Sequence, residues 1–548
     1  MTVPPQLDPA ATYDQAQKKR QVILDFTFIF LLIAAAFVLR IWGLSKMHFW
    51  DEAVYLQNAQ VICCGKANYS ELDSRPVLLS LIFAVVFLLW NNVYAASIAT
   101  AILNSFGPAL LYLSGRMITG RIPAAIASLL LAFSPFFVGV FPAGFVSDNT
   151  GNSLLSDSPA LTLILLSFWV LLHALRKQTD LRFASAGFVL ALAVLMRFPS
   201  LSSVAVLSLL ILAADRWWRA GSAIAVGFAA GIGPYLCWSR IRYGGFFRTF
   251  RSGWGHFQGL GESPLFYLQN FGNIFSWITL AGLALWLGRW TWFKLRQKGG
   301  NYRLSVVEST ATRHSQELEI FLWFWAASVL LFFSLLNHKE PRYVMPVAPP
   351  LFLLAGGGLS VLLKGRRMAA RVAGSLFLVG ALVCTFLPVR ERFESPFVDD
   401  EVSEEMQVAD FLNHSVPPAT VLYSNFNYPV FAYYTNLPIH RLPESLPENK
   451  PALYDALNRL PRDGVLIAYK NDVVADPSLE WLDSNPHFRR FREFPSLVLY
   501  KYRTSVNTPG ALMQVSATEG SAFPVTSVAS TEISNVARLV SASEAPGE

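Results

Sequence analysis

A succession of long apolar runs between residues 22 and about 388 constrains the fold of this chain more than any other feature. Many of these runs approach the ~20 residues that an α-helix needs to cross the hydrocarbon core of a membrane. Only 15% of the residues are charged, whereas a soluble domain carries about a quarter. The sequence therefore predicts a polytopic α-helical membrane protein. Its eleven predicted spans are 22–44, 93–114, 122–141, 158–175, 183–196, 201–214, 220–238, 274–290, 319–337, 344–363 and 372–388.

Basic residues between the spans predict the topology. They gather in the N-terminal segment and in the loops 115–121, 176–182, 215–219, 291–318 and 364–371. The positive-inside rule places such loops in the cytoplasm. They share one side only if the apolar stretch 76–90 does not cross, so we interpret that stretch as an interfacial or re-entrant helix on the outer face. The same loops account for the net charge of +7, so this charge does not indicate nucleic-acid binding.

Four regions follow from this reading. Residues 1–21 form a cytoplasmic N-terminal segment, and residues 22–388 form the transmembrane part. Residues 389–503 predict a small extracytoplasmic α/β domain, because helix-like segments (405–414, 451–460) alternate with strand-like ones (419–426, 464–470, 496–502). Residues 504–548 are rich in Ser, Thr, Ala and Val without periodicity, which predicts a disordered tail.

The sharpest polar signal is the sequence LLNHKEPRYVMPVAPP. It places five polar or ionisable residues in a very short loop between two apolar runs, namely His338, Lys339, Glu340, Arg342 and Tyr343. Such a cluster at a membrane turn is costly unless its members pair or bind something. Lys and Arg suit a phosphate, and Glu340 could hold Arg342 in place. An ordinary snorkelling loop is the bland alternative, but basic residues in an outer loop oppose the positive-inside rule.

Carboxylates also gather at the outer rim of the predicted bundle. Asp51 and Glu52 follow the first span, and Asp157 lies at the outer mouth of a later one. Burial at such a rim would raise their pKa and suit one of them to proton abstraction. Arg75, which opens the interfacial helix, and Arg197, between two short apolar runs, are further cations on this side. Each could instead be an interfacial residue that faces water.

These residues resemble a known family. Asp51-Glu52, Arg75-Pro76, Asp157 and Arg197-Phe-Pro are similar to motifs of the GT-C superfamily, specifically the protein O-mannosyltransferase and aminoarabinose-transferase group. The segment HKEPRY resembles the His-Lys-Glu-x-Arg loop of other mannosyltransferases in that superfamily. The resemblance covers about residues 22–365. Arg75 and Arg197 stand where relatives commonly have Lys, and only one Pro follows Arg75.

The resemblance implies an inverting transfer of a sugar, mannose or another hexose or pentose, from a polyprenyl-phosphate donor to a hydroxyl. The acceptor would be a protein, a lipid or a polysaccharide on the extracytoplasmic face of the cell or endoplasmic-reticulum membrane. Asp51 would be the base or would orient the acceptor, with Glu52 nearby. Asp157 would support that centre or, with Asp51, hold a divalent cation. The donor phosphate would be bound by Lys339, Arg342, Arg197 and His338, with Glu340, Tyr343 and Arg75 in support.

Two other functions compete with this one. A secondary transporter would show repeats and ionisable residues near the bilayer midplane, but the charges here gather at one face and no repeat is visible. A non-catalytic scaffold that carries an outer binding domain would not need eleven spans. The four cysteines, Cys63, Cys64, Cys237 and Cys384, show no spacing typical of a metal site or a disulfide framework.

Overall fold

The computed structural model of this 548-residue chain describes residues 9–42, 44–45, 50–66, 68–134, 138, 155–254, 261–298, 306–364, 368–394, 398–399, 402–443, 450–470 and 477–504. Met1–Thr504 is one compact unit. The tail predicted to be disordered lies outside the described residues, apart from its first residue, Thr504.

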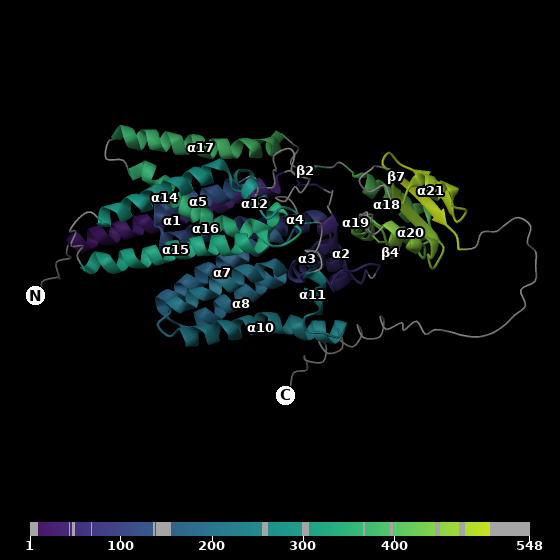
Figure 1. Cartoon of the computed structure of the whole chain (residues 1–548), viewed down its shortest axis with the longest axis horizontal. Helices are drawn as coiled ribbons and strands as arrows, with labels where there is room; N and C mark the ends of the chain where they lie inside the picture. Colours follow the sequence, from purple (N-terminus) through teal and green to yellow (C-terminus); the bar gives the residue numbers. More distant parts are fainter. Residues whose placement is uncertain are drawn as a thin grey trace, which may run out of the picture. The chain divides into compact units, whose positions relative to one another are not determined.

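The described residues between 9 and 394 are mostly helical, and their long helices run side by side (Figure 1). The α-helices are, in chain order, α1 (Pro9–Ile41), α2 (Trp50–Cys64), α3 (Leu78–Leu89), α4 (Val93–Ile118), α5 (Arg121–Phe133), α7 (Asp157–Lys177), α8 (Asp180–Met196), α9 (Leu201–Ser208), α10 (Trp217–Tyr243), α11 (Arg248–Trp254), α12 (Phe266–Gln269), α13 (Phe271–Phe275), α14 (Trp277–Lys298), α15 (Val306–Ser334), α16 (Ala348–Leu359) and α17 (Met368–Glu394). Short 3₁₀ helices are η1 (Phe198–Ser200), η2 (Leu209–Ala213), η4 (Pro341–Val347) and η5 (Ser360–Lys364).

A helix is present at each of the eleven predicted spans. Within the described residues, 6 helical segments are long and apolar enough to cross a membrane by length and composition. They are Gln17–Ile41, Val93–Ile118, Asp157–Lys177, Trp217–Tyr243, Glu317–Ser334 and Pro341–Leu363. The number eleven stays a prediction, because several of the other helices are shorter. Helix α3 has 12 residues, about 18 Å of helix, which is short for a span and agrees with the interfacial interpretation of 76–90.

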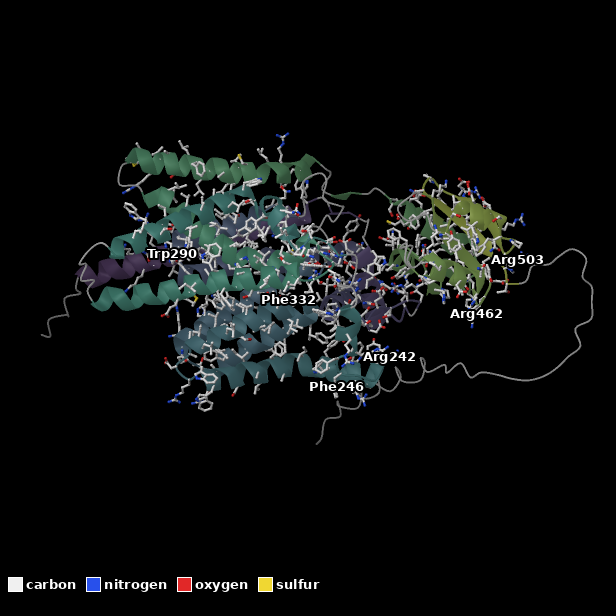
Figure 2. The ribbon with its side chains drawn as sticks, in the orientation of Figure 1. Arg242, Phe246, Trp290, Phe332, Arg462 and Arg503 are labelled. Atoms are coloured by element: carbon white, nitrogen blue, oxygen red, sulfur yellow. A yellow bond between two sulfur atoms is a disulfide. The ribbon has the colours of Figure 1, made fainter. Side chains whose placement is uncertain are left out.

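The surface of the helical part is apolar. Large hydrophobic side chains are exposed along the helices, including Phe26, Leu31 and Val226. In Figure 2, Trp290 and Phe332 lie on the helical part, Arg242 lies near one end of it, and Arg462 and Arg503 lie on the part that contains the sheet. Exposed apolar surface of this extent indicates a lipid-facing exterior.

Small residues allow two of the helices to pack closely. Helices α8 and α10 meet where Gly187 faces the backbone of Ile224 and Gly227 faces the backbone of Ala184. A Cβ atom at Gly227 would lie 1.8 Å from the carbonyl oxygen of Ala184, so no larger residue fits there. Such small-residue contacts are the usual means by which membrane helices approach one another without water to drive them together.

Residues 402–504, the C-terminal module, form a five-stranded sheet with helices. The strand order is β4-β3-β5-β7-β6, in which β4, β3 and β5 are parallel and β7 is antiparallel to both β5 and β6. Its elements are α18 (Glu404–Ser415), β3 (Val421–Ser424), α19 (Tyr428–Tyr434), β4 (Ile439–Arg441), α20 (Lys450–Asn458), β5 (Gly464–Tyr469), α21 (Leu479–Ser484), β6 (Phe488–Glu493) and β7 (Leu497–Tyr502).

The three strands and two helices predicted for this region are present. The sequence did not predict β4, β6, α19 or α21. Strand β6 has the sequence FRRFRE, which is too charged to be recognised as a strand. It lies at the edge of the sheet, where charged side chains prevent pairing with other chains. Helix α19 is rich in Tyr and Phe, which favour strands, but Pro429 near its first turn suits a helix start.

The chain is tied back to the helical part just before the module and within it. Before the module, strand β1 (Leu44–Ser45), after α1, pairs in parallel with β2 (Val398–Asp399), after α17. The loop after α2 is tied to α19 and β4 by Asn68, whose side-chain amide donates to the carbonyl oxygens of residues 432, 435 and 437 at 2.9, 3.1 and 3.2 Å. Lys66 donates to the carbonyl oxygen of Tyr433. At the end of α2, Cys63 and Cys64 form a disulfide, which the sequence analysis did not expect.

Candidate active site

Helix α2 carries the first functional side chain at its start. Asp51 lies in the first turn of α2, where the amino end of the helix dipole favours a carboxylate. Tyr55 follows four residues later, one helical turn on, and therefore lies on the same face. Its hydroxyl is hydrogen-bonded to Ser156, just before α7, at 2.9 Å. This bond joins α2 to the amino end of α7.

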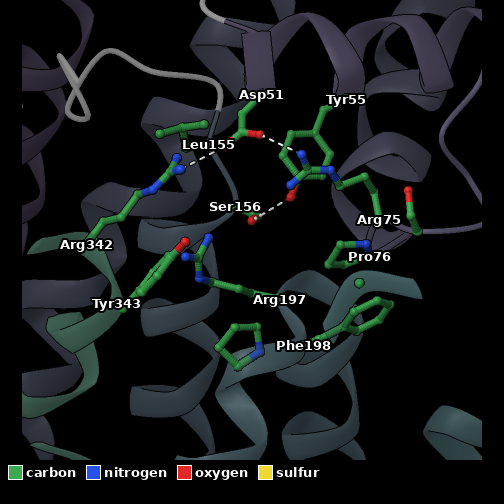
Figure 3. Close-up of a pocket in the computed structure, with 13 residues that line it drawn as sticks. Asp51, Tyr55, Arg75, Pro76, Leu155, Ser156, Arg197, Phe198, Arg342 and Tyr343 are labelled. Atoms are coloured by element: carbon green, nitrogen blue, oxygen red, sulfur yellow. Dashed lines mark hydrogen bonds and ion pairs between the residues drawn. The ribbon is translucent and has the colours of Figure 1, made fainter. Parts of the chain in front are cut away.

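Two arginines from distant parts of the chain converge on Asp51 (Figure 3). Arg75 Nη2 lies 3.0 Å from Asp51 Oδ1, and Arg342 Nη2 lies 2.8 Å from Oδ2. All three side chains are largely buried, with exposed fractions of 15%, 11% and 18% for Arg75, Arg342 and Asp51. Both oxygens of the carboxylate are therefore engaged by cations.

A second ion pair lies beside the first. Arg197, which ends α8, donates to Asp157 Oδ2 at 2.6 Å, and its guanidinium lies 5.3 Å from the ring centre of Tyr343. Asp157 is in the first turn of α7 and is buried. Its Oδ1 has no hydrogen-bond partner among the described residues. One acceptor at this site is thus available to a ligand.

The loop 338–343 folds around Glu340. Its carboxylate interacts with Arg342 and is hydrogen-bonded to His338 Nε2 at 2.9 Å, and it accepts from the Tyr343 hydroxyl at 3.1 Å. Lys339 is buried and donates to the carbonyl oxygen of Glu262 at 2.8 Å. The loop therefore fixes Arg342 through Glu340, while Lys339 anchors the loop itself.

These groups surround a cavity of about 60 Å³, which we call the central cavity. Its polar wall consists of Asp51, Tyr55, Ser74, Arg75, Ser156, Arg197, Arg342 and Tyr343. An adjoining small pocket shares Arg197, Arg342 and Tyr343 and continues along apolar side chains, among them Leu161, Ile164, Phe333 and Met345. Two cations, Arg197 and Arg342, thus stand between the polar central cavity and the apolar pocket, and Arg75 lines the central cavity alone.

The arginines set the electrostatics of Asp51. Burial raises the pKa of this carboxyl, but Arg75 and Arg342 lower it by more, so that its pKa lies below the usual value. The expectation that burial would leave Asp51 with a raised pKa is therefore wrong, because the sequence did not show that two guanidinium groups pair with it. Burial lowers the pKa of Arg75, and the adjacent Asp51 and Glu71 more than offset that effect.

The cavity suits an anion better than a metal ion. In the described part of the chain, no three His, Cys, Asp or Glu side chains lie close enough to hold a metal. Both oxygens of Asp51 contact arginines, and one oxygen of Asp157 does too. Three guanidinium groups would repel a divalent cation at this place, so the suggested metal site at Asp51 and Asp157 does not fit these residues.

Of the ten residues singled out in the sequence, five line the central cavity or the adjoining pocket beside Asp51: Arg75, Asp157, Arg197, Arg342 and Tyr343. Glu340 and His338 stand behind Arg342, and Lys339 points to backbone oxygens. Glu52 is buried. Its charge adds to the effect of burial in raising the pKa of Tyr434 in the C-terminal module. Sequence reasoning missed Tyr55 and Ser156. Their signals are the helical spacing from Asp51 and the position next to Asp157.

Comparisons with known proteins show which family and which folds the chain resembles. Residues 74–238 match the family model for dolichyl-phosphate-mannose-protein mannosyltransferases. The chain superposes on ArnT from Cupriavidus metallidurans bound to undecaprenyl phosphate with a TM-score of 0.57 and 14% identity, over 89% of this chain and 99% of that one. The protein has the GT-C fold.

A second solved GT-C structure extends the likeness. The oligosaccharyltransferase AglB from Archaeoglobus fulgidus, in complex with an inhibitory peptide and a dolichol-phosphate, matches with a TM-score of 0.53 and 11% identity, over 82% of this chain and 70% of that one. A comparison with curated protein sequences gives no significant match. The family model and the GT-C fold together support a glycosyltransferase-type enzyme in a membrane.

Proposed function

We propose that this GT-C protein transfers a sugar from a polyprenyl-phosphate donor to an acceptor hydroxyl, with inversion, on the extracytoplasmic face. One observation carries the proposal. Buried Arg75, Arg197 and Arg342 converge with Asp51 on a cavity that shares Arg197, Arg342 and Tyr343 with an adjoining pocket lined by apolar side chains. A lipid-linked phosphate has both halves of this arrangement, an anion and a hydrocarbon chain.

The donor phosphate is assigned to Arg342 and Arg197, with Arg75 at the far wall. A guanidinium group binds phosphate oxygens through two parallel hydrogen bonds. The first isoprene units follow the apolar crevice past Phe333 and Leu161. The family match and the undecaprenyl phosphate bound in the similar ArnT structure support this placement.

The reaction is one displacement at the anomeric carbon. The acceptor oxygen forms the new bond, the bond between the sugar and the phosphate oxygen breaks, and the electron pair leaves with the phosphate. Asp51 accepts the proton of the acceptor hydroxyl. Negative charge grows on the leaving phosphate, where fixed cations in a water-poor cavity stabilise it most.

A carboxylate with a lowered pKa is a weak base, so Asp51 has to be activated. One of its two arginine partners, Arg342, is also a phosphate ligand. When a phosphate takes over hydrogen bonds of Arg342, it adds negative charge beside Asp51 and weakens that ion pair, which raises the pKa of the carboxyl. The donor itself thus prepares the base, and proton abstraction waits for a bound donor.

The remaining candidate residues act through Asp51, Arg197 and Arg342. Glu340, with His338 and Tyr343 around it, orients Arg342. Asp157 orients Arg197. Lys339 holds the loop. Glu52 supports the position of α2 from its other side. No divalent cation is assigned.

Helix α7 supports the extracytoplasmic placement. This helix begins at Asp157 in the site and ends at Arg176 and Lys177. Its 21 residues span about 32 Å, close to the ~30 Å hydrocarbon thickness of a bilayer. The basic end would face the cytoplasm by the positive-inside rule, which leaves the site and the C-terminal module outside. The charged residues of α7 lie at its two ends, whereas a transporter would have ionisable residues near the bilayer midplane.

Binding of undecaprenyl phosphate to the purified full chain, followed by native mass spectrometry, tests the proposal. Arg342→Ala removes a charged hydrogen-bond donor, and such bonds contribute about 1.5–3 kcal/mol, so we expect roughly ten- to hundredfold weaker binding. Arg342→Lys should restore only part of the affinity, because it cannot bind bidentately.

The matched control is Arg121→Ala, which removes an arginine from an ion pair with Asp25 at the other end of the bundle. It should bind the lipid as the unmodified chain does. Equal binding by the Arg342→Ala and Arg121→Ala variants, or no retention of the lipid by the unmodified chain, would contradict the proposed donor site.

A further inference from the structure

A second, larger cavity of about 390 Å³ lies next to the central cavity. It is lined by Tyr69, Ser70, Glu71, Asp73, Ser74, Ser252 and Arg441, and we call it the outer pocket. Ser74 lines both cavities, and Arg75, the next residue, contacts Asp51. The outer pocket and the cavity that contains Asp51 are therefore separated by the wall at Ser74.

The lining of the outer pocket is entirely polar or amphipathic. It offers three serine hydroxyls, the Tyr69 phenol, two carboxylates and one guanidinium group. The crevice assigned to the donor lipid is instead lined by Leu, Ile, Phe and Met side chains. The two neighbouring spaces thus fit molecules of opposite character, which separates a place for a hydrophilic acceptor from the place for a lipid donor.

The charges of the outer pocket compensate one another. Glu71 is engaged by Arg75, whose Nε lies 3.2 Å from its Oε2, and accepts from the Tyr69 hydroxyl at 2.5 Å. The other two ionised side chains, Asp73 and Arg441, have opposite sign. A neutral partner with many hydroxyls satisfies both a carboxylate and a guanidinium group, since a hydroxyl both donates and accepts.

The C-terminal module contributes directly to this pocket. Arg441 ends β4, and its guanidinium lies 5.0 Å from the ring centre of Tyr428. The Tyr428 ring meets that of Trp50 edge to face, with centroids 5.7 Å apart. Arg75 lies 4.8 Å from the Trp50 ring. A stack of Arg441, Tyr428, Trp50 and Arg75 thus connects the pocket rim to the central cavity.

We propose that the outer pocket is the acceptor site and that the acceptor group it takes is a neutral glycan. The inference rests on the proposed glycosyl transfer and names its acceptor class. A hydroxyl of the glycan reaches Asp51 across Ser74, while Asp73 and Arg441 bind the hydroxyls that do not react. The C-terminal module is then a wall of the substrate site, and it contributes specificity without taking part in the chemistry.

The test is saturation-transfer NMR on the full chain in nanodiscs. The probes are neutral tri- and tetrasaccharides of gluco, manno and galacto configuration, a trigalacturonate and a serine-containing tripeptide. We expect saturation of neutral oligosaccharides. Asp73→Ala should weaken their binding roughly tenfold or more, because it removes a charged hydrogen-bond acceptor. Ser252→Trp should abolish it by filling the pocket.

The control for bulk is Arg251→Trp, on the preceding, exposed position of α11, which does not line the pocket and should bind oligosaccharides normally. Undecaprenyl phosphate binding is measured on the same samples and should be unchanged in the Ser252→Trp and Asp73→Ala variants. The proposed acceptor site is contradicted if the lipid binds but no neutral oligosaccharide does. It is also contradicted if the peptide or the trigalacturonate binds instead, or if Ser252→Trp does not change oligosaccharide binding. Loss of lipid binding in the unmodified chain contradicts the donor site alone.

Discussion

The two ends of the helical bundle contain the same ionic arrangement in different surroundings. At one end Asp51 lies between Arg75 and Arg342, and at the other Asp25 of α1 lies between Arg116 and Arg121, at 2.5 and 3.0 Å. The arginines beside Asp25 are 39% and 42% exposed, against 15% and 11% beside Asp51. Asp25 also accepts from the Tyr112 hydroxyl at 2.6 Å.

The difference in burial separates a structural cluster from a chemical one. Ion pairs whose two partners are both exposed contribute about 0–1 kcal/mol. The Asp25 side chain is itself only 10% exposed, so it is the arginines, which reach water, that distinguish this cluster. Around Asp51 the charges are desolvated and face a cavity, where an unpaired charge is costly and a bound anion gains most. An Asp between two Arg residues therefore does not by itself indicate a functional site, whereas a cavity beside the ion pairs does.

The largest expected effect separates these two aspartates. Asp51→Asn keeps the size and part of the hydrogen bonding of the side chain but removes the base, so we expect turnover to fall by about a hundred- to ten-thousand-fold. Binding of undecaprenyl phosphate should persist, because the two arginines lose a competing anion. The measurement is product formation from a polyprenyl-phosphate sugar donor by the purified variant.

Asp25→Asn makes the same chemical change at the other end of the bundle and should leave turnover within a few-fold of the unmodified chain. Its thermal unfolding temperature is the control for folding of both variants. Near-full turnover of Asp51→Asn, or an equal loss in Asp25→Asn, would contradict the assignment of chemistry to one end.

Reagent accessibility gives the next contrast, because the two ends are proposed to lie on opposite sides of the membrane. In a chain with Cys237 and Cys384 replaced by Ser, Arg462→Cys on the C-terminal module should react with an impermeant maleimide added to intact cells. Lys177→Cys, at the end of α7, should react only after permeabilisation. Both positions are exposed. Reversed labelling would overturn the topology and the proposed outer location of the site.

The sequence could predict the helices and the basic end of the bundle, but not the ion pairs at the other end. Hydrophobic run lengths located the helices, since a membrane span must be long and apolar, and the basic loops marked one end. The pairing of Asp51 with Arg342 joins residues 291 positions apart, and no local pattern indicates it. Because that pairing sets the pKa of Asp51, the electrostatics of the site could not be inferred from residue types.

The outer pocket could not be predicted from the sequence either, because its lining residues come from three separate segments. Arg441 is an ordinary basic residue in a three-residue strand, and only the fold brings it beside Tyr69. The same is true of Asn68, which by its composition belongs to a loop and in the structure ties α2 to the C-terminal module. Within HKEPRY the sequence indicated a charged cluster in which Glu340 holds Arg342, but not that Lys339 turns to backbone oxygens instead of the cavity.

The smallest expected effect concerns pH and the loop behind Arg342. The hydrogen bond to Glu340 raises the pKa of His338 above its usual 6.5, against an opposing effect of burial. A group whose pKa is higher in the folded chain stabilises folding fully below its unfolded pKa and loses that contribution as the pH rises through the folded value. The stabilisation from His338 should therefore be present at pH 5.5 and absent at pH 9.

We expect His338→Gln to lower the unfolding temperature of the detergent-solubilised protein at pH 5.5 and to change it little at pH 9. The pKa of Glu340 is lowered in the folded chain, so that carboxylate stays ionised throughout this range and the trend belongs to the histidine. In a Glu340→Gln background the pH-dependent difference should disappear, because its cause has been removed, and the double-mutant cycle isolates that coupling. A difference that persists without Glu340, or that grows toward pH 9, would show that His338 does not hold Arg342 through this carboxylate. The loop would then stabilise its arginine through Glu340 and Tyr343 alone.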